Sequence, residues 1–147
     1  MLQQKKQFQI LFSLILFLMI SAASEAQKET AEAHRRRWNE PAGSETVKNP
    51  FTDIASSADS GKIIYKKICS VCHGNSGKGD GVAAAGLATR PADHTSGSVQ
   101  SETDGELFWE LSNGHAPMPS YKTVLTEKQR WQLICFIRTL KSKPIHK

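Results

Sequence analysis

Cys69-Ser70-Val71-Cys72-His73 is the stretch of sequence that decides the fold. Two thiols lie three residues apart, and an imidazole follows the second directly. On a helical turn, residues three apart lie on the same face, so both thiols can reach one edge of a porphyrin and form thioethers with its vinyl groups. The C-x-x-C-H spacing is typical of c-type haem attachment. We therefore predict one covalently bound haem c, with His73 turned toward its iron.

Two other chemistries use a C-x-x-C pair, and the sequence favours neither. A redox disulfide of the thioredoxin kind needs a strand that leads into the motif, and no strand pattern precedes Cys69. A zinc site needs further ligands, but no second C-x-x-C follows and Cys135 stands alone.

The sequence around the motif resembles class I mono-haem cytochromes c of bacteria. The resemblance covers residues 49–140 and is carried by 61–65 (GKIIY), 69–73 (CSVCH), 74–81 (GNSGKGDG), 90–93 (RPAD) and 114–119 (GHAPMP). It implies an all-α cytochrome c fold, with three main helices around one covalently attached haem. It also implies a one-electron carrier rather than an enzyme.

The N-terminal segment has the layout of a secretory signal peptide. Lys5 and Lys6 precede an apolar run over 10–23, and small residues follow over 21–26. We expect residues 1–26 to be removed, with Gln27 as the first mature residue. The alternative is an uncleaved anchor, because Phe8 extends the run toward the roughly 20 apolar residues of a membrane span.

Both interpretations place the domain outside the cytoplasm, in the periplasm or anchored to the outer face of the inner membrane. The resemblance requires export too, since the haem of this family is attached after export. Residues 27–50 are polar and charged without apolar periodicity, and we expect a linker or arm there. The cytochrome domain is expected over residues 51–147.

Three helices are predicted in that domain, and no segment alternates like a strand. The first spans about 57–71, where Gly61, Tyr65 and Ile68 recur at i, i+4 and i+7. The second begins with a capping box at 103–106 and stops at 113–114. The third begins with a capping box at 126–129 and runs to about 141. The resemblance implies that the first and last helices cross where Gly61 meets Phe136.

Met118 is the expected second axial ligand of the iron. Met1 and Met19 lie in the segment expected to be removed, and Met118 lies between Pro117 and Pro119, which stiffen its loop. A thioether ligand raises the reduction potential relative to a second imidazole. The alternative is a core methionine that fills a gap.

Histidines are the competing ligands. His94 and His115 are the nearer candidates, and His34 and His146 lie in less ordered surroundings. Ligation by His115 would give a bis-histidine site of lower potential.

Supporting roles are assigned to residues of several segments. The resemblance implies that the Pro91 carbonyl accepts the second ring N–H of His73, although the length of the 74–90 loop departs from the family pattern. Such a bond fixes the imidazole tautomer. Candidates for hydrogen bonds to the haem propionates, each of which could equally be surface or core, are Arg90, Trp109, Tyr121, Arg130 and Trp131. Cys135 is expected to be a small buried hydrophobe in the last helix.

The leading hypothesis is an electron carrier between redox proteins. The resemblance implies a donor dehydrogenase or quinol-oxidising complex and an acceptor oxidase or reductase. A formal net charge of +5 favours acidic protein faces or anionic lipid, and no nucleic-acid recognition motif is present. The alternatives are a haem subunit tethered to a membrane complex through an uncleaved N-terminus, and a haem peroxidase or gas sensor with an open iron.

Overall fold

The computed structural model describes residues 2–141, apart from the side chains at positions 2–4, 8, 10, 14, 18, 21–24 and 26–31. The end of the predicted domain, 142–147, and with it His146, lies outside the described residues. The chain divides into two compact units, Met1–Asn39 and Glu40–Lys147. Between residues 2 and 141 the regular elements are all helical, which confirms the all-α class.

The first unit is one helix, α1, which spans Leu2–Trp38. It therefore includes residues 27–38, where the sequence was expected to form a linker or arm. Residues 27–38 form a helix because several of them are Glu, Ala, Lys or Arg, which are good helix formers. Arg36 pairs with Glu32 one turn earlier at 3.0 Å. None of the helices, as far as they are described, is both long and apolar enough to cross a membrane.

The second unit begins at residue 40 rather than at the expected 51. The short 3₁₀ helix η1 (Ser44–Thr46) packs so close to Gly105 that a Cβ there would overlap the carbonyl of Ser44. Asn49 Nδ2 donates to Asp104 Oδ2 at 3.0 Å. These contacts use backbone and polar groups, so no apolar periodicity marks them in the sequence.

The first predicted helix is present, but it is interrupted by a π-helical turn. It consists of α2 (Ile54–Ile64), a π-helical turn η2 (Tyr65–Cys69) and α3 (Ser70–His73). Asp53 caps its start, where its carboxylate accepts the Ser56 N–H. The helix ends at Gly74, whose φ of 77° few other residues adopt. The C-x-x-C-H motif thus forms the last turn of a long helical segment.

The two predicted capping boxes are both present. Helix α5 (Asp104–Asn113) is capped by Thr103 with Glu106, and α6 (Glu127–Thr139) by Thr126 with Gln129. Helix α6 ends two residues before the expected Lys141. Like η1, two further short elements were not predicted, the helix α4 (Gly97–Ser101) and the 3₁₀ turn η3 (Ala84–Gly86).

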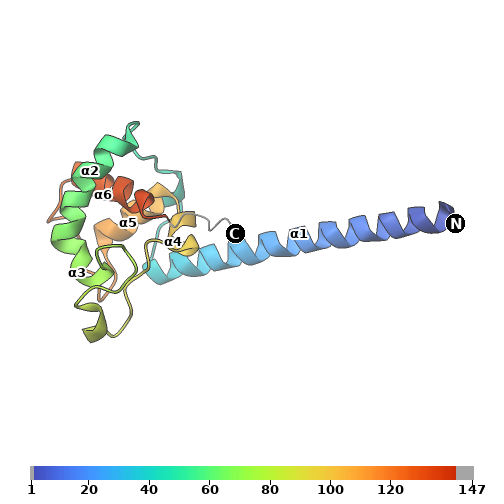
Figure 1. The fold of residues 1–147 in the computed structure, drawn as a ribbon, viewed down its shortest axis with the longest axis horizontal. Helices are drawn as coiled ribbons and strands as arrows, with labels where there is room; N and C mark the ends of the chain where they lie inside the picture. The colour runs from blue at the N-terminus through green and yellow to red at the C-terminus, as the bar shows by residue number, and fades with distance from the viewer. Residues whose placement is uncertain (1, 142–147) are drawn as a thin grey trace. The chain divides into compact units, whose positions relative to one another are not determined.

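The core lies where α2 and α6 pass across each other, green and red in Figure 1. At the crossing, a Cβ on Gly61 would overlap the backbone carbonyl of Gln132 and would touch Phe136. The expected Gly61–Phe136 contact is therefore present. Cys135 is fully buried in α6, as expected of a small hydrophobe, and none of the three cysteines forms a disulfide.

Arg138 holds the start of α5 against α6. Its Nε pairs with Asp104 Oδ1 at 2.7 Å, and its Nη2 donates to the Glu102 carbonyl at 2.6 Å. The guanidinium thereby fixes the junction between α4 and α5 with charge-assisted bonds, which are stronger than neutral ones.

Replacing Gly61 by Ala tests the α2–α6 crossing. An added Cβ must push two helix backbones apart, and overpacking of a core costs about 1–3 kcal/mol. Because the group it meets is backbone, we expect a loss of about 3 kcal/mol in the free energy of unfolding, measured by denaturant titration. The matched control is Gly97→Ala, because nothing lies within 4 Å of a Cβ at Gly97. Equal stability of the two variants would contradict the close crossing.

Candidate functional site

The two thiols of the motif lie in different surroundings. Cys69 is buried at the end of the π turn, and Cys72 is half-buried in α3. Burial, followed by the proximity of Cys72, raises the pKa of the Cys69 thiol to about 12. The thiol is therefore uncharged at neutral pH. The spacing keeps both sulfurs on one helical turn, as thioether formation with one porphyrin edge requires.

His73 is held by one hydrogen bond from its ring. Its Nδ1 donates to the backbone carbonyl of Ala92 at 3.0 Å. Burial lowers the pKa of the ring, while this hydrogen bond acts in the opposite direction. A neutral ring with Nδ1 occupied leaves Nε2 as the nitrogen able to bind a metal, and such an outer bond orients a ligating imidazole.

The acceptor of that bond corrects the prediction for Pro91. The family resemblance implied that the Pro91 carbonyl accepts the His73 ring N–H. In the structure the acceptor is the carbonyl of Ala92, one residue later. The reason is that the Pro91 carbonyl lies directly against Gly79, where a Cβ would overlap it.

Tight turns at glycines follow the motif. Gly79, with φ of 69°, donates to the carbonyl of His73 at 2.9 Å, and Gly81 donates to the carbonyl of Cys72 at 3.0 Å. These bonds satisfy carbonyls at the end of α3 that have no partner within the helix. They also bring the loop that carries Ala92 close to His73.

His94 lies on the flat face of His73. The two rings are stacked, with centroids 4.1 Å apart and planes 15° apart. His94 Nδ1 is hydrogen-bonded with the Tyr65 hydroxyl at 2.9 Å. Burial, and then the neighbouring His73, lower the pKa of His94 to about 3. The sequence did not predict the stacking of His94 on His73. The position of Tyr65, one helical turn after Gly61 on the face expected to be buried, was the available signal for a partner of His94.

This stacking removes His94 from the candidates for the second axial position. Two ligands of one haem iron lie on opposite sides of the porphyrin plane, so their rings cannot stack on each other. For a haem iron bound at His73 Nε2, the stacked His94 ring would lie on the same side of the porphyrin as His73.

Met118 lies in a tight turn that we call the Met118 turn, residues 114–119. Its backbone exchanges two hydrogen bonds with His115, at 2.8 and 3.0 Å. The side chain is half-buried and packs against the core cluster that includes Cys69. Nearby, the Tyr121 N–H donates to the Leu111 carbonyl at 3.1 Å and ties the following residues to α5.

Tyr121 connects the Met118 turn to the motif. Burial raises the pKa of its phenol, and the nearby thiols of Cys69 and Cys72 raise it further. Tyr121, two residues after the turn, packs against the core cluster that contains Cys69. The turn and the motif thus border one apolar cluster.

The remaining propionate candidates have different surroundings. Arg130 is buried, donates through Nη1 to the carbonyls of Lys122 and Leu125, and lies 5.0 Å from the ring centre of Phe108. Trp131 is buried and stacks on Phe108 at 4.0 Å. Two buried polar atoms, Arg130 Nε and Trp109 Nε1, have no hydrogen-bond partner. Arg90 is exposed and donates to the Lys78 carbonyl.

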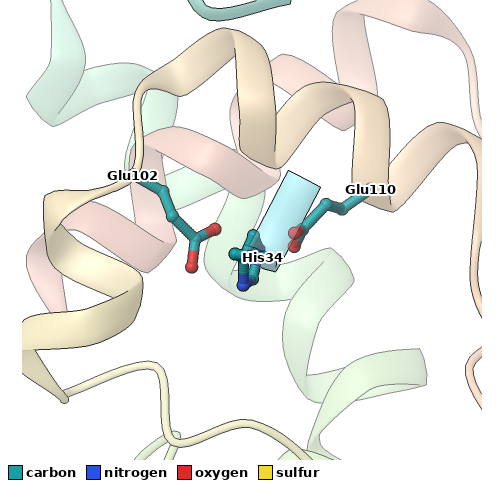
Figure 2. Close-up of side chains that lie close together, drawn as sticks. All are labelled: His34, Glu102 and Glu110. Carbon is teal, nitrogen blue, oxygen red and sulfur yellow. The ribbon is translucent and has the colours of Figure 1, made fainter. Parts of the chain in front are cut away.

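Two acidic side chains lie close together, Glu102 directly after α4 and Glu110 within α5. Glu102 and Glu110 have carboxylate oxygens within 4.8 Å of each other, and Figure 2 shows both side chains. The same figure labels His34, which belongs to the N-terminal unit. Glu102 is half-buried and Glu110 is buried, and both take part in other interactions.

Comparison with known proteins decides the family. The model of the family described as cytochrome c oxidase, cbb3-type, subunit III matches residues 56–137. The chain belongs to this family of c-type cytochrome domains. The matched region runs from the first turn of α2 to α6 and includes the motif, the Ala92 loop and the Met118 turn. This cytochrome c domain is accordingly a haem electron-transfer domain.

Solved structures share the fold. A chain of the reducing HAO-like protein complex of Kuenenia stuttgartiensis matches with a TM-score of 0.59 and 28% sequence identity. The match covers 65% of this chain and 50% of that chain, so this protein spans about half the length of that relative. No curated protein sequence is significantly similar to the chain.

The residues of the cytochrome c domain fit the haem that the family implies. Two thiols share a helical turn, and the imidazole after them has Nδ1 occupied and Nε2 free for iron. The buried donors Arg130 Nε and Trp109 Nε1, which have no partner in the protein, suit carboxylates of a cofactor.

Replacing Gly79 by Ala tests the loop that positions Ala92. The residue has a left-handed φ, and its added Cβ would overlap the Pro91 carbonyl. We expect a loss of about 2 kcal/mol in the free energy of unfolding, since a left-handed conformation alone costs a side chain about 1–2 kcal/mol. Gly86→Ala is the control, because a Cβ there meets nothing within 4 Å. A Gly79→Ala variant as stable as this control would show that the loop does not pack as described.

Proposed function

We propose that this protein is an exported one-electron carrier with a single haem c. Cys69 and Cys72 would bind the haem through thioethers, and His73 and Met118 would be the axial ligands. The observation that carries the proposal is the His73 ring, which follows two thiols on one helical turn and has Nδ1 bonded to the Ala92 carbonyl. The haem would supply the one-electron couple, and the protein would supply ligands, orientation and an apolar environment.

The ligand set favours electron transfer over catalysis. With an imidazole on one side and a thioether on the other, no position on the iron is open to a substrate. A thioether also raises the reduction potential relative to a second imidazole. Support for Met118 comes from its half-buried place against the cluster that contains Cys69, and from the stacking that excludes His94.

The carboxylates of a haem would need hydrogen-bond donors from the protein. Arg130 Nε and Trp109 Nε1 are the candidates, because each is buried without a partner in the protein. Tyr121 is a further candidate, since it packs against the core cluster that contains Cys69. The guanidinium of Arg90 is exposed, so we assign it no role.

The redox partners would be proteins that dock on an exported, positively charged domain. The donor would be a dehydrogenase or a quinol-oxidising complex, and the acceptor an oxidase or a reductase. The net charge of +5 favours partners with acidic faces.

A second candidate function is that of a haem subunit tethered to a membrane oxidoreductase complex. The description of the matching family, a subunit of a cytochrome c oxidase, favours it. The apolar run over residues 10–23 would supply the anchor. Sequencing the N-terminus of the exported protein separates the two: a start at Gln27 indicates a diffusible carrier, and a start at Met1 indicates an anchored subunit.

Met118→Ala tests the axial ligation. The ferric wild-type protein should show a low-spin spectrum with a long-wavelength sulfur-to-iron charge-transfer band. The variant should lose the band, bind carbon monoxide when reduced, and have a reduction potential lower by on the order of 0.1 V, a fraction of the about 0.8 V over which axial ligands tune haem.

His115→Ala is the matched control in the same turn. Its backbone bonds to Met118 do not need the imidazole, so the band and the potential should stay at the wild-type values. A wild-type protein without the band, or a Met118→Ala variant that kept it, would exclude Met118 as the ligand.

A further inference from the structure

The His73 ring is restrained by more than its hydrogen bond. The hydrogen bond at Nδ1 limits rotation of the ring about its Cβ–Cγ bond, but hydrogen-bond angles tolerate a range of ring orientations. The His94 ring, stacked on the face of His73 with centroids 4.1 Å apart, opposes that rotation. Stacked aromatic rings attract each other through their π systems. The two contacts together define the plane of the imidazole.

His94 is in turn fixed on three other sides. Its Nδ1 is bonded with the Tyr65 hydroxyl at 2.9 Å. Its backbone N–H donates to the Gly77 carbonyl at 2.7 Å. Its own carbonyl accepts from Gln100 Nε2, also at 2.7 Å, and the same amide donates to the Ile137 carbonyl of α6. The residue is therefore held through both its side chain and its backbone.

Tyr65 connects this pair to the helix crossing. It has no exposed surface, and its ring lies against Phe136 with centroids 5.0 Å apart. Phe136 is the residue that meets Gly61 where α2 and α6 cross. A continuous set of packed rings thus runs from the crossing through Tyr65 and His94 to His73.

We propose that His94, held by Tyr65, is a positioning residue that fixes the plane of the His73 imidazole and thereby tunes the haem iron. The inference rests on the proposed ligation of iron by His73. The orientation of an axial imidazole relative to the porphyrin nitrogens determines how the iron d orbitals split. A ring held in one orientation gives one electronic environment, and a ring free to rotate gives several.

Electron paramagnetic resonance of the full-length ferric holoprotein, together with its reduction potential, tests the proposal. His94→Ala removes the stacked ring, and we expect shifted and broadened low-spin signals with a changed potential. His94→Phe keeps a ring but loses the bond to Tyr65, and Tyr65→Phe keeps both rings but loses the same bond. Both conservative variants should fall between wild type and His94→Ala.

Val99→Ala is the matched control for a general loss of packing. Val99 is a buried core residue that belongs to neither the stack nor its hydrogen bonds. The control should unfold at a lower temperature and keep the wild-type signal. Line shapes altered as much in Val99→Ala as in His94→Ala would overturn the proposal, because the effect would then report destabilisation alone.

The remaining outcomes distinguish a failure of the proposed axial ligation from a failure of the proposed role of His94. A wild-type protein without a low-spin haem signal would overturn the axial ligation itself. A normal wild-type signal that His94→Ala leaves unchanged would overturn only the role of His94. If His94→Ala does not attach haem, the two conservative variants decide, and signals identical to wild type in both would overturn the proposal.

Discussion

The hydrogen bond from His73 Nδ1 to the Ala92 carbonyl is the interaction on which the rest of the site depends. It joins the last turn of the motif helix to a loop nineteen residues later in the chain. The bond leaves Nε2 as the ring nitrogen that can bind iron, and the turns at Gly79 and Gly81 bring the loop within reach. A c-type haem needs its protein to present an imidazole in one orientation, and this bond is the first means of doing so.

The close crossing of α2 and α6 supplies the second constraint. Because Gly61 has no side chain, Phe136 approaches the backbone of α2, and Tyr65 one turn later packs against the same ring. The Tyr65 hydroxyl then reaches His94, which covers the face of His73. The most buried part of the fold is thereby in physical contact with the proposed iron ligand.

The local signals were predicted from the sequence, and the family resemblance also implied the Gly61–Phe136 contact, but other tertiary contacts were not predicted. The C-x-x-C-H motif and both capping boxes depend on neighbouring residues, so their positions could be predicted. The shift of the acceptor from Pro91 to Ala92 depends on how a loop packs on Gly79, which no local pattern encodes. The stacking of His94 on His73, and the inclusion of residues 40–50 in the compact unit, likewise arise from contacts between distant segments.

The measurement that tests the account most directly is the intact mass of the exported, purified protein, followed by mass analysis of its peptides. The account predicts one haem per chain that resists acid extraction and lies on the peptide that contains Cys69 and Cys72, with neither thiol open to alkylation. A chain without haem, with a haem lost on extraction, or with a Cys69–Cys72 disulfide would contradict it.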